Sequence, residues 1–371
     1  MKLAFCLFRY FPFGGLQRDF LRIAEESFRR GHEVDIFTMR WEDKFPAEFN
    51  VTLIPVSGWQ NHTRAQSFVT ALKKYFSKKK YDLVIGFNKM PGLDVYYAAD
   101  TCYQAKARKQ HAAWYRFTPR YRHLVDYENA VFSKRAKTNI LLISKTQQAE
   151  FSHYYQTPSE RFHLLPPGIS KDRIAPSNRE ELRHDCRREF GLREEDFLLL
   201  MIGSGFKTKG LDRILKGIAA LPESLNNRSF LYVIGKDNPD VFLRQAKKLK
   251  IAKQIKFLGG RNDVARFLLA ADLLLHPAYN ENTGTVLLEA LVAGLPVLTT
   301  DVCGYADYIR AANAGIVLSS PYVQEKFNET LVEMLLSNER ISWQKNALEF
   351  TKTADIYSMP IRAVDIIERL R

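Results

Sequence analysis

The sequence has few cysteines and no long apolar run. Its four cysteines, at positions 6, 102, 186 and 303, are far apart, so no CxxC pair or Cys/His cluster predicts a zinc site or a disulfide framework. No run of about 18 apolar residues predicts a transmembrane helix. The apolar residues 2–8 are too few for an export signal and Arg9 follows them at once, so we expect a buried strand there. A globular protein of the reducing cytoplasm is the class that these absences favour.

Three common nucleotide- and metal-binding signatures are also missing. Gly14 and Gly15 follow the first expected strand, but the third spaced glycine of the dinucleotide fingerprint is absent. The glycine-rich loop 203–210 lacks the GxxxxGK(S/T) order of a P-loop. No DxD-type pair of carboxylates lies near residues 277–285. A nicotinamide oxidoreductase, a P-loop and a DxD metal site are therefore disfavoured.

The composition is that of a globular protein with a sizeable core and an uneven charge. Hydrophobic residues make up 46% of the 371 residues and charged residues 26%, and this length suggests two or three domains. Of the net charge of +14, residues 1–167 carry 26 Lys and Arg against 15 Asp and Glu, or +11. The first half is therefore expected to meet an anionic partner, which leaves nucleic acid, anionic lipid and a phosphorylated substrate open.

Apolar strands and amphipathic helices alternate along the whole chain, as at 2–8 and 197–202, each followed by helical periodicity. Such alternation predicts parallel sheets covered by helices. The rigid Pro166-Pro167-Gly168 connection divides the chain. We expect two Rossmann-like, doubly wound α/β domains facing a cleft, over residues 1–167 and 168–352. Residues 353–371 are expected to form a C-terminal helix that packs back on the first domain.

The most informative run is residues 277–290, in which an apolar strand leads through a polar loop into an apolar helix. Asn282 or Thr283 is placed to cap this helix, and Gly284 lets a ligand approach the backbone. A helix N-terminus, with its unpaired N–H groups, suits a phosphate. Glu281 before the terminus and Glu289 inside the helix match the hydroxyls at the two ends of a nucleotide-sugar. The ordinary alternative is a capping carboxylate and a solvated helix glutamate.

Other polar positions are further candidates. Asp19 lies one turn into the first helix, and Asp100 lies just past a strand's carboxyl end, where open parallel sheets bind ligands. Lys209 in the glycine-rich loop is placed to reach a diphosphate, and the backbone around Arg261 to bind a nucleobase edge. The alternatives are a helix-dipole acid for Asp19, a turn acid for Asp100 and a solvated lysine for Lys209.

The segment 103–135 mixes cationic and aromatic side chains unlike its surroundings. Phe117, Tyr121, Leu124 and Val125 are spaced as one helical face. Trp and Tyr among Lys and Arg fit the interface of an anionic membrane, while a solvated helix and a stacking surface for single-stranded nucleic acid are the alternatives. We favour the membrane. The residues predicted to face it are Lys106, Arg108, Lys109, Trp114, Tyr115, Arg116, Phe117, Arg120, Tyr121 and Arg122.

Six segments together carry a resemblance to a known family: 10–20, 86–94, 164–169, 259–264, 271–279 and 300–305. Over nearly its whole length the chain resembles glycosyltransferase family 4 of the two-Rossmann-domain (GT-B) enzymes, and within it the glucosyltransferases of the lipopolysaccharide core. The resemblance implies a retaining, metal-independent transfer of glucose from UDP-glucose to an inner-core, phosphorylated heptose region of lipopolysaccharide. It implies no cofactor, no nucleic-acid partner, and peripheral attachment to the anionic cytoplasmic face of the inner membrane.

The same resemblance implies roles for individual residues. Glu281 binds the donor sugar and Glu289 the ribose, while Lys209 and Arg173 contact the diphosphate. Gly15 backs the diphosphate from the first domain, and the region of Arg261 receives uracil. The expected donor-binding residues are Gly15, Arg173, Lys209, Arg261, Asp263, Thr283, Gly284, Thr285 and Glu289, and the expected catalytic residues are Glu281, Asp100 and Asp19.

One position departs from the family pattern. Many relatives carry an arginine directly before the loop lysine, where this chain has Thr208. Lys207 is the expected substitute, although a lysine supplies a point charge and not the bidentate fork of arginine. Another UDP-sugar, another lipid-linked acceptor, or a basic nucleic-acid-binding protein remain the alternatives to the implied function.

Overall fold

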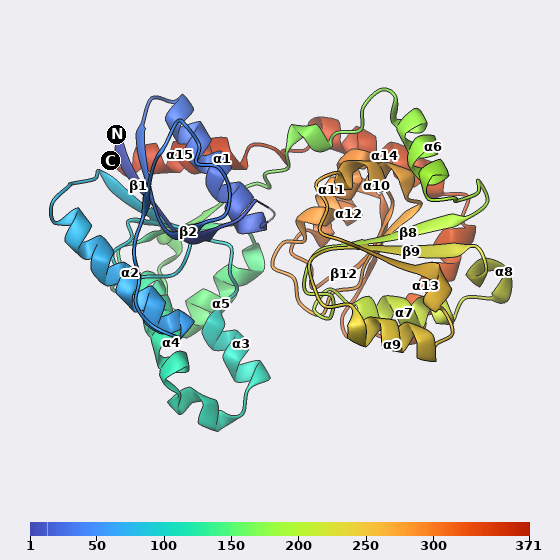
Figure 1. Ribbon diagram of the computed structural model, residues 1–371, viewed down its shortest axis with the longest axis horizontal. Helices are drawn as coiled ribbons and strands as arrows, with labels where there is room; N and C mark the ends of the chain where they lie inside the picture. The colour runs from blue at the N-terminus through green and yellow to red at the C-terminus, as the bar shows by residue number, and fades with distance from the viewer. Residues whose placement is uncertain (13) are drawn as a thin grey trace. The chain divides into compact units, whose positions relative to one another are not determined.

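The computed structural model describes residues 1–12 and 14–371, which form two compact units (Figure 1). Unit 1 comprises Met1–Gly168 with Ser358–Arg371, and unit 2 comprises Ile169–Tyr357. Each unit is a parallel sheet with helices on both faces, so the expected pair of doubly wound α/β domains is confirmed.

Unit 1 is built on a seven-stranded sheet with the order β3-β2-β1-β4-β5-β6-β7. Its strands are β1 Lys2–Tyr10, β2 Glu33–Trp41, β3 Asn50–Leu53, β4 Leu83–Gly86, β5 Val95–Ala98, β6 Asn139–Leu142 and β7 Phe162–Leu164. Its helices are α1 Gly15–Arg29, α2 Asn61–Phe76, α3 Tyr103–Gln110, α4 Pro119–Phe132, α5 Lys145–Tyr155 and α15 Met359–Arg369, with short 3₁₀ turns η1 Ala113–Phe117 and η2 Ser159–Arg161.

The interior strand β1 shows why both faces of this sheet are covered. Successive side chains of a strand point to opposite faces. Leu3 and Phe5 are buried in the core under α1 and α15, whereas Ala4 and Cys6 are buried in the core under α2 and α5. An apolar strand without alternation therefore reads correctly as a strand buried on both sides.

The C-terminal helix α15 returns to unit 1 and packs beside α1, as Figure 1 shows. Arg30, at the end of α1, donates to Asp365 and Glu368, each at 2.8 Å. The return begins at Ser358 and not at residue 353. Residues 353–357 stay with unit 2 because the N–H of Ile169 bonds the carbonyl of the fully buried Ile356 at 2.8 Å. The first expected boundary, after residue 167, lies one residue before the division after Gly168.

Unit 2 is built on a six-stranded sheet with the order β10-β9-β8-β11-β12-β13. Its strands are β8 Phe197–Ile202, β9 Ser229–Ile234, β10 Ile255–Gly259, β11 Leu273–His276, β12 Val297–Thr300 and β13 Gly315–Leu318. Its helices are α6 Arg179–Glu189, α7 Leu211–Ala219, α8 Glu223–Asn226, α9 Asp240–Lys248, α10 Val264–Ala270, α11 Thr285–Ala293, α12 Ala306–Ala312, α13 Gln324–Leu336 and α14 Arg340–Thr353, with 3₁₀ turns η3 Lys171–Arg173 and η4 Ala252–Gln254.

Helices cover the two faces of this sheet in two groups. Figure 1 shows α10, α11, α12 and α14 on one face and α7, α9 and α13 on the other. Leu198 and Leu200 of β8 pack toward the first group, and Leu199 and Met201 toward the second. Among the residues described, no helix is both long enough and apolar enough to cross a membrane.

Candidate active site

The carboxyl end of β11 leads into the loop that the sequence singles out. The fully buried strand gives way to a loop, and α11 begins at Thr285. The sequence predicted Asn282 or Thr283 as its N-cap, but the N-cap is Gly284. Gly284 has φ = +80°, a conformation that glycine adopts without strain. The Thr283 carbonyl instead accepts the N–H of Tyr305 at 2.8 Å, which ties the loop to the segment after β12.

Glu281 is a mostly buried carboxylate, with 16% of its side chain exposed. It forms an ion pair with the ammonium of Lys209, and its Oε2 lies 3.4 Å from Nε2 of His276. Burial alone would raise the pKa of Glu281, but the nearby imidazole of His276 and the charge of Lys209 outweigh it and lower the pKa to about 2. At neutral pH Glu281 is therefore ionised and accepts hydrogen bonds.

Glycines bring Lys209 to Glu281. Gly203, at φ = +128°, directly follows β8, and a Cβ there would lie 2.5 Å from Cε of Lys209. Gly210, at φ = +83°, precedes α7, and a Cβ there would lie 2.0 Å from the carbonyl oxygen of Pro277. The lysine stem thus lies against bare backbone, and the two loops touch because both side chains are absent.

His276 belongs to this cluster, and the sequence analysis missed it. It ends β11, its side chain is fully buried, and it interacts with Glu281 and Cys303. Burial disfavours the charged imidazole, but the interactions with Cys303 and Glu281 outweigh that effect, so the pKa of His276 is raised. A single polar residue closing the apolar run 273–275 is the signal that would have identified it.

Two further donor-binding candidates lie on or beside α11. Glu289 is buried, with 6% of its surface exposed, in a helix that is otherwise apolar after Thr285. A solvated helix glutamate is therefore the wrong description of it. Arg173 lies in η3, which contacts α11, and is half-buried.

Lys207, the expected substitute for the missing arginine, already forms an ion pair within unit 2. The ammonium of Lys207 donates to Asp212 at 2.6 Å and to the hydroxyl of Tyr279 at 3.3 Å. Thr208 contributes its carbonyl oxygen, which accepts the N–H of Tyr279 at 2.8 Å. Lys207 therefore forms an ion pair with the first turn of α7, whereas Lys209 is the lysine of this loop that pairs with Glu281.

The region expected to receive a nucleobase follows β10. The guanidinium of Arg261 donates two hydrogen bonds of 2.7 Å to the carboxylate of Asp263. The hydrogen bond from Arg261 lowers the pKa of Asp263. The two side chains thus satisfy each other, and nucleobase binding by the backbone of this segment stays a prediction.

The unit 1 candidates gather at the carboxyl end of its sheet. Gly15 begins α1 and is exposed, and a Cβ there would meet nothing within 4 Å. The carboxylate of Asp19 accepts the hydroxyl of Tyr97, on β5, at 2.8 Å. Burial raises the pKa of Asp19 to about 6, against the opposing effects of Tyr97 and two arginines. Asp100 is exposed two residues beyond the end of β5.

The basic aromatic segment consists of α3, η1 and α4, and most of its predicted membrane-facing side chains are exposed. Exposed are Lys106, Arg108, Lys109, Trp114, Arg116, Phe117, Arg120 and Arg122. Tyr121 is a correction: it is only 8% exposed and packs against Tyr103 and Tyr115. Tyr115 is half-buried, with its hydroxyl 2.9 Å from that of Tyr103. The predicted single helical face is also wrong, because Phe117 ends η1 before α4 begins.

A buried glutamate holds the start of this segment in place. Glu128 of α4 is fully buried and accepts the N–H groups of Tyr103 and Gln104, at the start of α3, at 2.8 and 3.0 Å. Lys89 supplies the neutralising charge at 2.5 Å. No local sequence pattern predicts these contacts, because Glu128 lies 25 residues from Tyr103 and 39 residues from Lys89.

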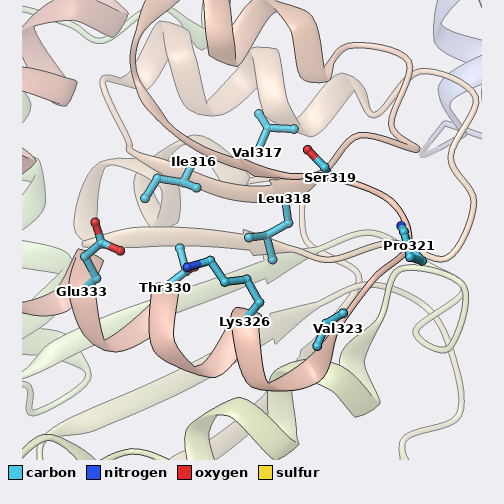
Figure 2. Close-up of a pocket in the computed structure, with 9 residues that line it drawn as sticks. All are labelled: Ile316, Val317, Leu318, Ser319, Pro321, Val323, Lys326, Thr330 and Glu333. Atoms are coloured by element: carbon cyan, nitrogen blue, oxygen red, sulfur yellow. The ribbon is translucent and has the colours of Figure 1, made fainter.

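A separate cavity of about 420 Å³ lies between β13 and α13 in unit 2 (Figure 2). Its lining combines β13 residues with Pro321, Val323, Lys326, Thr330 and Glu333. None of the residues singled out from the sequence lines it. Over residues 1–12 and 14–371 there is also no group of three His, Cys, Asp or Glu side chains arranged to hold a metal ion.

Comparison with known proteins gives consistent matches over both units. Residues 13–173 match the model of Glycosyltransferase Family 4, and residues 183–350 that of Glycosyl transferases group 1. The lipopolysaccharide glucosyltransferase WaaG of Escherichia coli (strain K12) is 46% identical over 99% of this chain and 98% of its own length.

Solved structures agree with these matches. A crystal structure of WaaG, a glycosyltransferase involved in lipopolysaccharide biosynthesis, superposes with a TM-score of 0.93 at 46% identity, covering 98% of this chain and 99% of that one. Anabaena HepE in complex with UDP and glucose superposes with a TM-score of 0.77 at 16% identity over the full length of both chains, which shows a shared fold.

Proposed function

The chain belongs to the glycosyltransferases of family 4, and from that premise we propose that it transfers glucose from UDP-glucose to an inner-core heptose of lipopolysaccharide. The observation that carries the proposal is the ionised, mostly buried Glu281, paired with Lys209 just before the start of α11. The relative that is 46% identical is a lipopolysaccharide glucosyltransferase, and that likeness supports both glucose and a lipopolysaccharide acceptor.

The site residues suit the chemistry of a nucleotide-sugar. In the proposed reaction the bond between the glucose anomeric carbon and the β-phosphate oxygen breaks, and the anomeric carbon bonds the acceptor oxygen with retained configuration. Negative charge then grows on the departing UDP. Lys209 and Arg173, with the N–H groups that open α11, are proposed to stabilise that charge without a metal. Glu281 accepts hydrogen bonds from the glucose hydroxyls, and Glu289 holds the ribose.

The acceptor hydroxyl must lose its proton. Asp19 and Asp100, both at the carboxyl end of the unit 1 sheet, are the carboxylates proposed to take it. The raised pKa of Asp19, about 6, suits a group that binds and releases a proton near neutral pH.

Ligand-induced thermal stabilisation tests the donor. The intact chain is heated alone and with UDP-glucose, UDP-galactose, ADP-glucose or NADH at equal concentration. We expect the largest rise in melting temperature with UDP-glucose, because a ligand that binds only the folded state stabilises it. Stabilisation by NADH alone, or by none of the four, would overturn the proposal. Mass spectrometry of a heptose-terminated lipopolysaccharide acceptor should then show the addition of one hexose.

We also propose that unit 1 attaches peripherally to the anionic cytoplasmic face of the inner membrane through α3, η1 and α4. The exposed cations and the exposed Trp114 and Phe117 support this surface. Each Lys or Arg near such a surface contributes about 1 kcal/mol, so losing two weakens binding by roughly thirtyfold.

Vesicle co-sedimentation tests the attachment. Arg116→Gln with Arg120→Gln should reduce binding to phosphatidylglycerol vesicles, whereas Lys247→Gln with Lys248→Gln, which removes two exposed cations from α9 of unit 2, should not. Equal effects of the two pairs would reject this surface. Retention of RNA at physiological salt, with a steep salt dependence, would favour nucleic acid instead.

A further inference from the structure

The strongest unassigned feature is the buried imidazole behind the proposed sugar-binding carboxylate. His276 is fully buried at the carboxyl end of β11, and its Nε2 lies 3.4 Å from Oε2 of Glu281. The hydroxyl of Thr299 donates to the carbonyl oxygen of His276 at 2.9 Å. The same hydroxyl lies 3.4 Å from the sulfur of Cys303. The backbone of His276 and the neighbouring thiol are thus fixed from β12.

Three titratable groups, from three different segments, change the pKa of the His276 imidazole. Glu281 comes from the loop after β11, Cys303 from the loop after β12, and Lys209 from the loop before α7. Glu281 itself is anchored by its backbone: its carbonyl oxygen accepts the N–H of Gly304 at 3.3 Å, and the residue forms a parallel bridge with Cys303. What the backbone leaves adjustable is the carboxylate, which touches both Lys209 and His276.

Lys209 has two anionic partners, one in the structure and one in the proposed reaction. In the structure its ammonium pairs with Glu281. In the proposed reaction the same ammonium neutralises the diphosphate. When it turns to the phosphate, Glu281 is left largely buried without its cation, and an unpaired buried charge is costly. In the part of the chain that the structure describes, the imidazole of His276 is the other charged or chargeable side chain paired with that carboxylate.

We infer that His276 is a positioning residue, which holds the carboxylate of Glu281 in its sugar-binding orientation while Lys209 pairs with the diphosphate of the donor. In the structure Nε2 of His276 is buried without a hydrogen-bond partner, 3.4 Å from Oε2 of Glu281. When Lys209 pairs with the diphosphate, the imidazole donates its Nε2 proton to Glu281, and no covalent bond changes. The inference rests on the proposed function, because it needs a sugar at Glu281 and a phosphate at Lys209.

Comparison of UDP with UDP-glucose isolates this role. In the UDP complex, we expect water to fill the place of the sugar and to solvate Glu281. In the UDP-glucose complex the sugar displaces that water, so the orientation of the carboxylate determines how well the hydroxyls bind. Loss of the imidazole should therefore affect the glucose part of the affinity far more than the UDP part.

Calorimetry on the full chain measures both affinities for wild type, His276→Leu and His276→Gln. We expect UDP to bind all three within about twofold. The preference of His276→Leu for UDP-glucose over UDP should fall on the order of tenfold, since a hydrogen bond to a charged group is lost. His276→Gln should recover most of it, because its side-chain amide places an N–H near the Nε2 position. The kcat of His276→Leu should fall with that preference.

Several results would overturn the inference. They are an unchanged preference in His276→Leu, equal behaviour of the leucine and glutamine variants, or equal weakening of UDP and UDP-glucose. Should the leucine variant not fold, ¹⁵N NMR of the wild-type imidazole decides, with the resonance identified by its loss in His276→Gln. A protonated Nε2 is required in the UDP-glucose complex, and an unprotonated Nε2 refutes the role. A wild type that does not prefer UDP-glucose over ADP-glucose would instead refute the proposed function.

Discussion

Removing the charge of Lys209 should destabilise unit 2 in a pH-dependent way. The substitution Lys209→Met retains an unbranched stem to lie over Gly203 and deletes the ammonium that pairs with Glu281. The side chains of Lys209 and Glu281 are 19% and 16% exposed, so solvent screens their interaction only weakly. In the variant the carboxylate keeps its contact with His276 but loses its full positive partner.

The expected magnitude follows from the pKa of Glu281. Its fall from 4.5 to about 2 corresponds to roughly 3 kcal/mol of stability at neutral pH. Lys209 shares that effect with His276 while burial opposes both, so we expect the variant to lose about 2 kcal/mol. A lowered carboxyl pKa stabilises the folded state above the unfolded value of 4.5, and the stability is lost as the pH falls toward 2. The deficit of the variant should therefore shrink by roughly half between pH 7 and pH 3.

Urea unfolding monitored by ¹⁹F NMR of 5-fluorotryptophan measures this effect. Trp343 is the tryptophan of unit 2 and is 5% exposed, so its resonance reports the unfolding of that unit. Lys207→Met is the matched control, because Lys207 is two-thirds exposed and its ion pair with Asp212 is worth under about 1 kcal/mol. A stability of Lys209→Met within 0.5 kcal/mol of wild type, on the order of the error of such measurements, or a deficit that does not change with pH, would refute the reasoning.

Four further substitutions separate the proposed roles. Glu289→Gln should mainly raise the KM for UDP-glucose, whereas Glu281→Gln should mainly lower kcat, and steady-state kinetics with identical signatures for the two would remove that division. Tyr97→Phe deletes a hydrogen bond that lowers the pKa of Asp19. If Asp19 acts as an ionised base, the acidic limb of the pH profile of kcat/KM, expected near pH 6, should move to higher pH. A limb that does not move would exclude Asp19 as the base. Gly15→Ala adds a methyl group into open space at the start of α1, so the melting temperature should not change. The affinity for UDP, measured by calorimetry, should fall about tenfold, which corresponds to a loss of about 1.4 kcal/mol. An unchanged affinity would place Gly15 away from the donor.

Periodicity was a good guide to the fold because a strand buried on both faces and an amphipathic helix leave distinct patterns in the chain. The sequence predicted β8 with the bounds it has, Phe197–Ile202. It was less accurate where local signals are weak. α2 begins at Asn61, but its first large apolar side chain is Phe68, so no apolar periodicity marks the start of this helix.

Within the candidate site, the sequence by itself determined which residues stand at strand ends and helix starts. Glu281, Gly284, Lys209 and Asp19 were all identified from short-range order, since a strand, a glycine turn and a helix follow one another within about 15 residues in such units.

Only the tertiary structure decided which of these residues meet. Glu281 and Lys209 are 72 positions apart and pair because bare backbone at Gly203 and Gly210 lets two loops touch. The proposed role of His276 follows only from the fold, which places its ring against Glu281. Tyr121 is not exposed as predicted, because its ring packs against Tyr103. The physical reason is that periodicity records which face of an element is buried, whereas contacts between distant segments depend on side-chain packing, which no local pattern encodes.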